Sequence, residues 1–380
     1  MLYTTPSLDA HDERVLAEIE ACYADVRKAT GGSAAEHRWE GQLRRQLVAG
    51  AVQGSNSIEG YTVSLETAAV IVAGGPVPSD VPDETRDALL GYRDALSWVL
   101  QTPGMDFFAH HEMALSALHF MMLRTRLAKR PGRYRTGGVI VTDGEDPMTP
   151  AYVGPDADEV PALMTELVDW LNTGDLDAPT LVRAAMAHLN LVCVHPWRDG
   201  NGRMSRCLQT LVIARAGMVA PEFCSIEEWL GRKLNTLRYY AVLNGTGRTY
   251  HPDADTHEWI RFNLRAHHQQ ARLVWLRLER ARRTWEDMTA LVNRLGLPER
   301  TVSALHTAAL GRLRRDTYQQ DEGISRDLAL RDLRRLEAAD LLDSHGYGVT
   351  LYYTAAGRAR DVDDIVLNAL RTPATEPYET

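Results

Sequence analysis

The amino-acid sequence predicts a mainly α-helical protein with a small β-hairpin inserted among the helices and a winged helix-turn-helix domain near its C-terminus. Apolar residues recur at helical spacing through most of the chain before residue 285. Residues 132–155 interrupt this periodicity with β-branched side chains between turn-forming residues. After about residue 285, short helical segments precede an amphipathic helix, a glycine-rich turn and an alternating strand.

The length of 380 residues indicates two or three folded units. Changes in the residue pattern set the expected boundaries. These give an N-terminal helical region (1–110), a core (111–280), the winged helix-turn-helix domain (285–370) and a disordered tail (371–380).

Helices fill most of the first two regions. A helix over residues 15–28 is ended by Gly31-Gly32, and one over 39–52 runs into Gly54. A third, over 83–100, begins after Pro82 and stops before Pro103. Further helices are expected over 108–127, 160–171, 179–194, 202–216 and 257–293.

The exception is the segment 132–155, which contains the β-branched run Val139-Ile140-Val141 with glycine and proline on both sides. This composition predicts a short strand or hairpin.

The C-terminal pattern begins with two short helices, over residues 291–297 and 301–313. Residues 325–342 form a strongly amphipathic helix, and a glycine turn at 346–348 leads into a strand over 349–354. This order of elements is typical of a winged helix-turn-helix.

Charge and composition exclude several functional classes. A net charge of −9 argues against a chain that coats nucleic acid or an anionic membrane, although a local DNA contact stays open. Four scattered cysteines fit neither a zinc site nor a disulfide framework. No apolar run approaches the length of a membrane span. We therefore expect a cytoplasmic protein that does not bind membranes.

The segment HPWRDGNGRMSR, residues 195–206, contains the strongest chemical signal. Pro196 ends the preceding helix and leaves His195 on a fixed loop. Gly200-Asn201-Gly202 permits backbone conformations in which N–H groups converge on an anion, and the next helix starts there.

The side chains of this segment extend the anion site. Arg203 and Arg206 lie three residues apart and share one face of the helix, so both can bind phosphate oxygens. Asp199 is suited to hold Mg²⁺, and His195 is suited to accept a hydroxyl proton near neutral pH. The set predicts attack of a hydroxyl on a phosphoryl group of a nucleotide.

The same segment resembles the signature of the Fic family, H-x-F-x-[D/E]-G-N-G-R-x-x-R, with Trp197 in place of phenylalanine. The resemblance implies a Fic-type helical bundle that transfers AMP from ATP to a protein hydroxyl, with self-modification. It implies that His195 deprotonates the target hydroxyl and that Asp199 holds Mg²⁺. The implied ATP contacts are Gly200, Asn201 and Gly202 near the α-phosphate, Arg203 at the α- and β-phosphates, and Arg206 at the γ-phosphate.

A second resemblance lies upstream, at Ser55-Asn56-Ser57-Ile58-Glu59-Gly60. It is similar to the family's inhibitory motif [S/T]-x-x-x-E-[G/N], in which the glutamate pairs with the second arginine of the signature. Here Glu59 would pair with Arg206 and block the γ-phosphate, because a carboxylate competes directly with phosphate for one guanidinium.

Two weaker resemblances complete the site. The hairpin is similar to the family's flap, where Val139, Ile140 and Val141 would pair with an extended target segment; a simple connecting hairpin is the alternative. Tyr239 and Tyr240 resemble a tyrosine pair near the adenine, and packing tyrosines are the alternative.

Other interpretations stay open. The same site could remove AMP from modified protein, or a winged-helix regulator could carry a Fic-like sensor domain without turnover. Arginines at 326, 331, 334 and 335 could contact DNA, but Asp327, Asp332 and Glu337 interleave with them. The sequence therefore favours protein interaction or homodimerisation over DNA there. The target protein and donors other than ATP also stay open.

Overall fold

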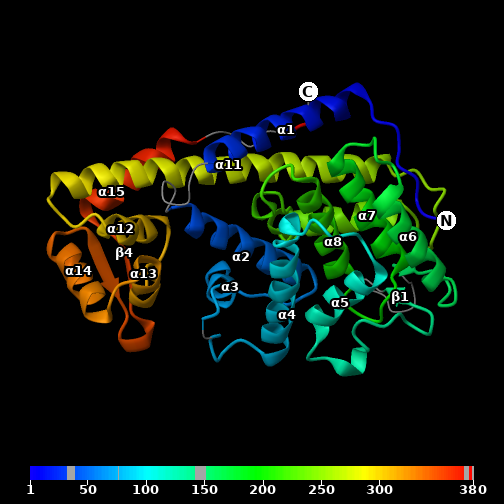
Figure 1. Ribbon diagram of the computed structural model, residues 1–380, viewed down its shortest axis with the longest axis horizontal. Coiled ribbons are helices and arrows are strands. Elements are labelled where there is room, and N and C mark those ends of the chain that lie inside the picture. Colours follow the sequence, from blue (N-terminus) through cyan, green and yellow to red (C-terminus); the bar gives the residue numbers. More distant parts are fainter. Residues whose placement is uncertain (32–38, 76, 142–150, 372–375, 379–380) are drawn as a thin grey trace. The chain divides into compact units, whose positions relative to one another are not determined.

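The computed structural model describes residues 1–31, 39–75, 77–141, 151–371 and 376–378. It is mainly helical, as predicted, with a few short strands (Figure 1). The chain divides into two compact units. The first consists of Met1–Arg27, Arg45–Arg272 and Glu376–Thr380, and the second of Lys28–Arg44 and Leu273–Thr375. The expected N-terminal region and core thus form one unit rather than two.

The first unit is a helical bundle around two central helices. Helix α7 packs along α8, and α4 and α6 pack against this pair. Its elements are α1 (Ala10–Thr30), α2 (Glu40–Ile58), α3 (Leu65–Val72), α4 (Asp83–Val99), η1 (Thr102–Gly104), α5 (Glu112–Leu123), η2 (Leu127–Lys129), β1 (Ile140–Val141), β2 (Tyr152–Val153), α6 (Val160–Thr173), α7 (Thr180–Val194), α8 (Asn201–Ala216), η3 (Pro221–Phe223), α9 (Glu227–Leu230), α10 (Lys233–Gly245) and α11 (His257–Arg294). Helices α1, α2 and α11 contribute residues to both units.

Helix α8 is buried on nearly every side, from Arg203 through Ala214. A helix that is covered all round normally carries only apolar residues. This one also places the polar side chains of Arg203, Arg206 and Gln209 in the interior. Each needs a partner there or a ligand, because an unpaired buried polar group is costly.

The predicted hairpin is a two-stranded antiparallel sheet in which Ile140 pairs with Val153 and Val141 with Tyr152. Residues 142–150 of this segment lie outside the described residues. Val153 also forms a parallel bridge with Thr249. Strand β2 is therefore covered on both edges, and β1 lies on the outer edge.

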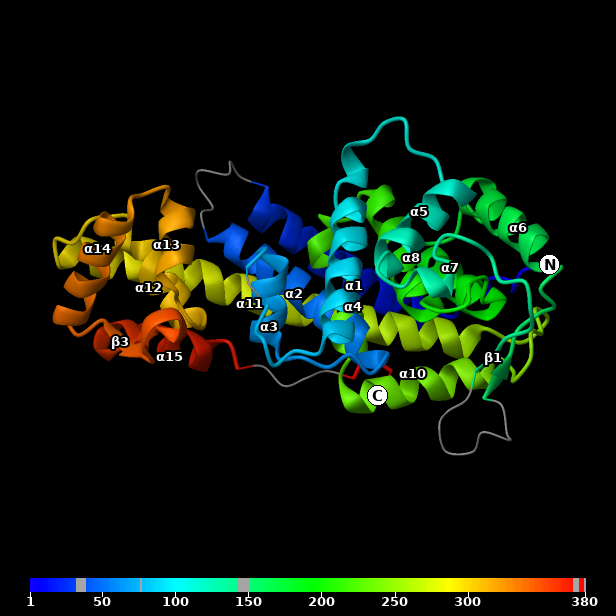
Figure 2. The ribbon, with the colours of Figure 1, turned by 90° about the horizontal axis from the view of Figure 1, so that it is seen from below.

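The second unit contains the predicted amphipathic helix followed by a two-stranded hairpin, together with helices that the sequence did not indicate (Figure 2). Its elements after α11 are α12 (Thr301–Leu310), α13 (Arg315–Glu322), α14 (Arg326–Ala338), β3 (Leu342–His345), η4 (Gly348–Thr350), β4 (Tyr352–Ala355) and α15 (Gly357–Ala369). Gly323 has a φ of 61°, which turns the chain between α13 and α14, and Ser325 caps α14 by accepting a bond from Leu328 N. Leu305, Leu333 and Leu336 belong to its core.

Several expectations differ from the structure in detail. The strand expected over 349–354 begins only at Tyr352, after the short helix η4. The separate helix expected over 291–297 is absent from this described stretch, because α11 continues to Arg294. Helices α3, α9, α10, α13 and α15 were not predicted. The helix expected over 108–127 is shorter, because His111 lies outside α5 and accepts a bond from Met113 N as its N-cap. The tail expected to be disordered has ordered contacts at Tyr378, whose hydroxyl donates to Asp12 Oδ1 at 3.1 Å.

The expected neutral face of α14 also needs correction. Asp332 does not lie among the exposed arginines: it is buried and accepts bonds from Arg300 and Tyr318. Within the described part of the chain, no helix has the length and apolar character required to span a bilayer.

Candidate active site

His195 occupies a constrained position at the end of α7. Its φ is 51°, and its backbone N–H donates to Leu191 O at 3.0 Å, which closes the helix. The ring Nδ1 lies 3.1 Å from Val192 O. Because a carbonyl only accepts, Nδ1 carries the proton and Nε2 keeps its lone pair. Burial lowers the pKa of His195 to about 4, so the ring is neutral at physiological pH.

The loop after His195 is held by its own side chains. Asn201 Oδ1 accepts a bond from Trp197 N at 3.0 Å, and Asn201 Nδ2 donates to Trp197 O at 2.9 Å. The Asn201 amide is thus used to close the loop. These two bonds use the amide oxygen and one N–H of Nδ2, which leaves the second Nδ2 N–H and the backbone N–H for the phosphate contact that the resemblance implied.

Two residues outside the motif brace the same loop, and the motif itself gives no sign of them. His119 of α5 stacks on the buried Trp197 ring, with centroids 4.4 Å apart, and its Nε2 donates to Asp199 O at 2.8 Å. Arg135 Nε donates to His195 O at 2.9 Å. The indole that replaces phenylalanine therefore has a stacking partner, and the catalytic loop is fixed from both sides.

The start of α8 has the features of an anion site. Gly200 has a φ of 80°, a conformation that favours glycine, and no side chain caps the helix. The first intrahelical bond here runs from Met204 N to Gly200 O, so the N–H groups before it point out of the helix end. A Cβ on Gly202 would lie 2.5 Å from Glu59 Oε1, so a larger residue there would push that carboxylate aside.

Arg203 and Arg206 are both 1% exposed. Within the described residues, Nε and Nη1 of Arg203 and Nη1 of Arg206 have no hydrogen-bond partner. Buried guanidinium nitrogens are costly to leave unpaired. Buried, unpaired guanidinium nitrogens in the first two turns of a helix are therefore what a phosphate site requires.

The remaining bonds of Arg206 come from the segment that ends α2. Arg206 Nε donates to Ser55 Oγ at 2.9 Å, and Nη2 donates to Ser55 O at 3.0 Å and to Glu59 Oε1 at 2.6 Å. Both residues of the expected inhibitory motif thus contact the expected arginine. Burial opposes the charge on Arg206, but Glu59 outweighs it and raises the pKa of the guanidinium.

Close backbone packing holds this end of α2 in place. A Cβ on Gly54 would lie 2.2 Å from Glu227 O, and one on Gly231 would lie 2.5 Å from Gly54 Cα. Only glycine permits such an approach. Ser57 Oγ adds a bond to Gly54 O at 2.8 Å.

Tyr61, two residues beyond Glu59, covers the other arginine. The Arg203 guanidinium lies 5.4 Å from the Tyr61 ring centroid, and that of Arg126 lies 5.1 Å from it. Arg126 Nη1 also donates to the Tyr61 hydroxyl at 2.7 Å. The segment from Glu59 to Tyr61 therefore contacts both arginines of the motif.

Asp199 is a single carboxylate among cations. Its oxygens lie 3.4 Å from Lys129 Nζ, 3.7 Å from Arg203 Nη2 and 3.8 Å from Arg126 Nη1. One carboxylate suits Mg²⁺ only when phosphate oxygens and water complete the coordination. The residues present fit a metal that arrives with a nucleotide.

The two tyrosines of α10 differ in exposure. Tyr239 is 1% exposed, and its hydroxyl lies 2.9 Å from His188 Nε2. Tyr240 is 43% exposed and donates to Ile58 O at 3.3 Å. Of the pair, Tyr240 can offer a ring face to a ligand, whereas Tyr239 is a packing residue.

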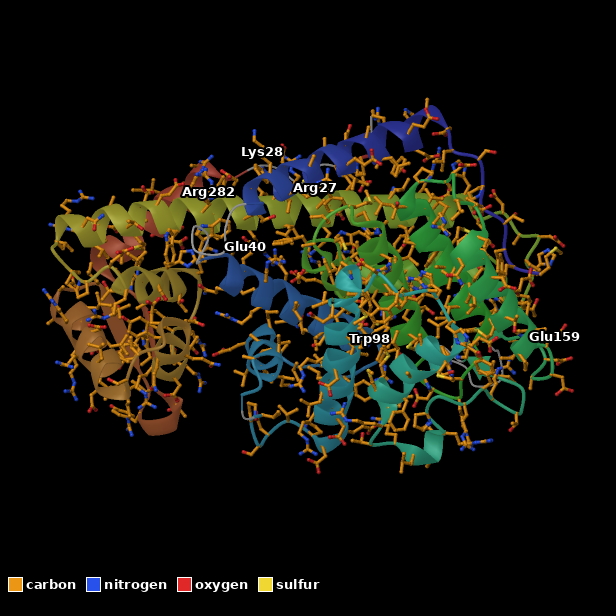
Figure 3. The ribbon with its side chains drawn as sticks, in the orientation of Figure 1. Arg27, Lys28, Glu40, Trp98, Glu159 and Arg282 are labelled. Atoms are coloured by element: carbon orange, nitrogen blue, oxygen red, sulfur yellow. The ribbon has the colours of Figure 1, made fainter. Side chains whose placement is uncertain are left out.

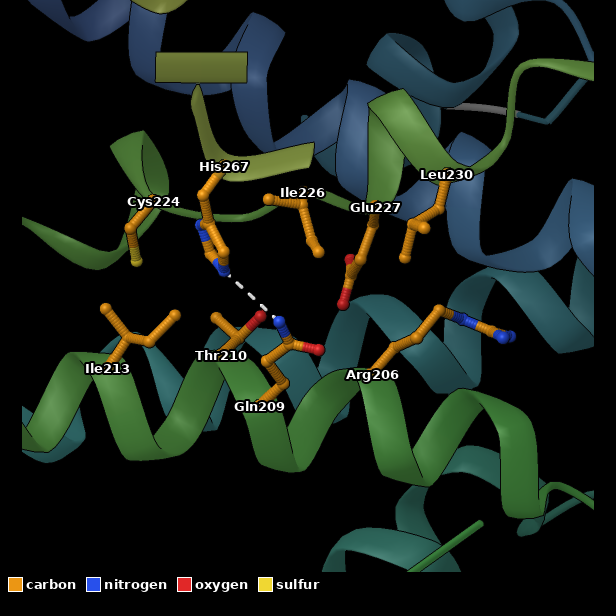
Figure 4. Close-up of a pocket in the computed structure, with 9 residues that line it drawn as sticks. All are labelled: Arg206, Gln209, Thr210, Ile213, Cys224, Ile226, Glu227, Leu230 and His267. Carbon is orange, nitrogen blue, oxygen red and sulfur yellow. Dashed lines mark hydrogen bonds between the residues drawn. The ribbon is translucent and has the colours of Figure 1, made fainter. Parts of the chain in front are cut away.

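The Tyr239 hydroxyl begins a buried chain of polar groups. The Gln209 amide joins His188 to His267. Its Oε1 lies 2.6 Å from His188 Nδ1, and its Nε2 donates to His267 Nε2 at 3.2 Å, the bond drawn in Figure 4. His267 Nδ1 lies 3.3 Å from the Tyr23 hydroxyl. If both histidine rings are neutral, every bond of the chain is satisfied, and each group donates its proton to the next, from the Tyr239 hydroxyl to the Tyr23 hydroxyl.

A second acid lies near Arg206. Glu227 lines a narrow pocket together with Arg206 and Gln209 (Figure 4), and it accepts a bond from the Tyr92 hydroxyl. Burial raises the pKa of Glu227 to about 7, although Tyr92 and Arg206 both lower it. Sequence reasoning did not find this residue, because nothing in the motif indicates it.

The hairpin adjoins His195. A Cβ on Gly154 would lie 3.8 Å from His195 Cβ, and the Tyr152 hydroxyl donates to Cys193 O at 2.5 Å. Ile140 is 64% exposed on the outer strand, while Val139 and Val141 are half-buried. The strand therefore presents an apolar edge close to the catalytic loop.

Comparison with known proteins identifies the domain that holds this site. Residues 110–213 match the family model described as Fic/DOC family and form a Fic domain. The chain is 29% identical over 219 residues to protein adenylyltransferase fic-1 of Caenorhabditis elegans, covering 56% of this chain and 40% of that protein. It is 31% identical over 165 residues to protein adenylyltransferase Fic of Nematostella vectensis, covering 43% of this chain and 36% of that protein. The chain thus spans less than half of these curated relatives.

Solved structures share the fold. A Fic family protein from Desulfovibrio desulfuricans superimposes with a TM-score of 0.59 at 23% identity, over 93% of this chain and 98% of that chain. Fic-1 of C. elegans superimposes with a TM-score of 0.51 at 22% identity, over 69% of this chain and 71% of that chain.

Proposed function

We propose that this protein, whose residues 110–213 form a Fic domain, transfers AMP from ATP to a serine, threonine or tyrosine hydroxyl of a target protein. The observation that carries the proposal is a neutral His195, with a lone pair on Nε2, on the loop that leads directly into a helix start with two buried arginines. The curated relatives named as protein adenylyltransferases support the same reaction.

In the proposed reaction, His195 Nε2 accepts the proton of the target hydroxyl. The hydroxyl oxygen then forms a bond to the α-phosphorus of ATP. The bond between the α-phosphorus and the bridging oxygen breaks, and pyrophosphate leaves with that electron pair. Arg135 and the Val192 carbonyl are positioning residues, because they fix the orientation of the His195 backbone and ring.

The buried arginines would bind the triphosphate. The unpaired nitrogens of Arg203 suit the α- and β-phosphates, and Arg206 suits the γ-phosphate once Glu59 has left. The backbone N–H groups from Gly200 to Gly202 would face the α-phosphate. Tyr240 would stack on the adenine.

Mg²⁺ would be held by Asp199, and its charge would neutralise the phosphate oxygens that it contacts. Lys129 and Arg126, which lie near the same carboxylate, would keep it oriented before the nucleotide binds.

Autoinhibition by Glu59 is the second part of the proposal. Its carboxylate occupies Arg206 and lies against Gly202, so a γ-phosphate and Glu59 would compete for one guanidinium. The target would dock on β1, whose Val139-Ile140-Val141 edge can add a strand.

The test uses ATP labelled at either the α- or the γ-phosphate, with self-modification as the readout. We expect Glu59→Gly to raise labelling from the α position on the order of tenfold to 100-fold, the value of one charge-assisted bond. His195→Ala in the Glu59→Gly background should abolish it. Asp80→Gly removes an exposed acid from a turn of the same unit and should change nothing.

Each contrary outcome has a distinct meaning. Label from the γ position would identify a kinase. Unchanged labelling after Glu59→Gly would disprove the inhibitory role, and labelling that survives His195→Ala would disprove the base. AMP release from modified protein by the wild type, lost in Glu59→Gly, would favour the reverse reaction.

A further inference from the structure

Helix α14 in the second unit has two chemically different faces. Its inner face consists of Ala329, Leu333 and Leu336, all buried in the core. Its outer face carries side chains three and four residues apart that are all exposed: Asp327, Arg331, Arg334 and Arg335. Three positive charges therefore face one negative charge on this surface, and the exposed Arg326 and the half-buried Glu337 lie at its flanks.

The acid that would neutralise this face points the other way. Asp332 is 3% exposed and accepts bonds from Arg300 Nε at 2.7 Å, Arg300 Nη2 at 2.9 Å and the Tyr318 hydroxyl at 2.9 Å. Its charge is used inside the unit. The face of α14 is thus more basic than the sequence suggested.

The outer arginines of α14 are also unlike others in this unit. Arg282, which Figure 3 labels, pairs with Glu279 and Glu286, and Arg280 binds Asp363 through two nitrogens. Within the described residues, no carboxylate lies within ion-pair distance of Arg331, Arg334 or Arg335. Their charges are therefore available to a binding partner.

The surroundings of this face favour a nucleic-acid partner over a protein. No large hydrophobic side chain of α14 is exposed, whereas protein interfaces depend on apolar or aromatic anchors at their centre. Helix α13, the turn at Gly323 and α14 form a helix-turn-helix, followed by the hairpin β3–β4. At the tip of this hairpin Tyr347 is 92% exposed.

We infer that the outer face of α14, through Arg331, Arg334 and Arg335, binds the phosphate backbone of duplex DNA, with the tip of the β3–β4 hairpin beside it. A helix fits the major groove, and guanidinium groups bind phosphate oxygens through paired donors. The binding depends on charge, so it weakens as salt rises. It is independent of the AMP-transfer site.

The experiment measures binding of the full chain to a fluorescein-labelled duplex of about 20 base pairs by anisotropy, between about 50 and about 200 mM salt. Three phosphate contacts predict a slope of about −2.7 in log affinity against log salt. The triple variant Arg331→Ala, Arg334→Ala, Arg335→Ala should lose at least about tenfold in affinity at low salt, and most of that slope.

A matched control removes equal charge elsewhere in the same unit. The triple variant Arg294→Ala, Arg358→Ala, Arg371→Ala takes three exposed arginines from other elements and should change affinity less than about twofold. Replacing the three α14 arginines with lysine should keep the salt slope, and equal thermal midpoints would show that all variants fold.

Three results would overturn the inference. The first is that the wild type does not bind the duplex at low salt, or binds it with no dependence on salt. The second is that the control triple variant loses as much affinity as the α14 triple variant. The third is that the α14 triple variant binds the duplex as tightly as the wild type. If an acidic protein bound this face while duplex DNA did not, the partner class would be wrong. None of these results bears on AMP transfer.

Discussion

The start of α8 and the outer face of α14 both present arginines three residues apart, Arg203 with Arg206 and Arg331 with Arg334. In sequence the two pairs look alike. In the structure the first pair is almost completely buried and the second is exposed. Burial, and not spacing, decides what each pair can do.

A buried guanidinium has already lost its water, so it binds whatever anion is held at the right place. Arg206 illustrates this, because Ser55 and Glu59 supply three acceptors for it. An exposed guanidinium keeps its water and is screened by salt. An exposed guanidinium contributes to binding when several of them together neutralise phosphates along a polyanion. The first arrangement suits a small ligand in one geometry, and the second suits a long anion.

The largest effect should come from removing a buried arginine. In the Glu59→Gly background, Arg206→Ala should lower kcat/KM for AMP transfer on the order of 100-fold or more, because truncation of a buried charge contact costs about 2–5 kcal/mol. Initial rates with α-labelled ATP measure this. Arg334→Ala should leave the rate unchanged and reduce the salt slope of DNA binding by about 1.

The comparison would fail if Arg206→Ala cost no more than a few-fold in kcat/KM. It would fail equally if Arg334→Ala slowed AMP transfer as much as Arg206→Ala. A normal thermal midpoint for both variants excludes unfolding as the cause.

Salt should separate the two regions next. Between about 50 and about 200 mM salt, duplex binding through three phosphates should weaken about 40-fold. AMP transfer by the Glu59→Gly variant should change less than about threefold, because the arginines that bind the nucleotide are buried and poorly screened. Anisotropy and initial rates in the same buffers give both numbers. Equal salt dependence would mean that the buried pair is more accessible than the structure indicates.

The next effect is a loss of folding stability at acid pH, caused by the buried histidines of the polar chain in the first unit. Burial lowers the pKa of His188 and of His267 to about 3, compared with about 6.5 for a histidine in an unfolded chain. Between these values the unfolded state binds more protons, so the stability present at neutral pH is lost as the pH falls below about 6.5. Each of the two histidines should lower the free energy of unfolding by about 2 kcal/mol at pH 5.

Glu227 acts in the opposite direction. Burial raises its pKa to about 7, so the folded state holds this proton more tightly and acidification from pH 7 stabilises the fold. The histidine contribution is isolated by His267→Gln, whose amide can still bond Gln209. Urea unfolding should show the wild type falling by about 2 kcal/mol more than this variant between pH 7 and pH 5. Parallel pH profiles would disprove a neutral, buried His267.

Local physics predicted the catalytic loop well, because its constraints lie within a few residues. Pro196 ends α7, Gly200 forms the turn with a φ of 80°, and α8 begins at Asn201, so Gly202 already lies in the helix. The contact between Glu59 and Arg206 joins residues 147 apart in the chain, and only the family resemblance indicated it. His119 and Arg135 carry no local signal of their role.

Other errors came from counting the residues of a helix without asking which side of the helix each residue lies on. Asp332 was counted with its neighbouring arginines, yet it lies three residues after Ala329 and four before Leu336, both on the apolar stripe. A helical projection would have placed it inside. Tyr239 and Tyr240 are adjacent, so they point to different sides of α10, and only one could face a ligand.

The smallest expected effect concerns Tyr61, whose ring lies over the Arg203 guanidinium. The arginines on the outer face of α14 are exposed and have no such ring over them among the described residues. Cation–π contact with a shielded guanidinium is worth about 0.5–2 kcal/mol. Tyr61→Ala in the otherwise unchanged protein should therefore raise basal self-modification between about twofold and about thirtyfold, less than Glu59→Gly. Tyr61→Phe keeps the ring and loses only the bond from Arg126, so its effect should be smaller.

In the Glu59→Gly background, Tyr61→Ala should add little, because the segment has already released Arg206. If Tyr61→Ala instead lowered the rate in that background, the ring would be helping to bind the nucleotide, and Glu59 alone would be the inhibitor.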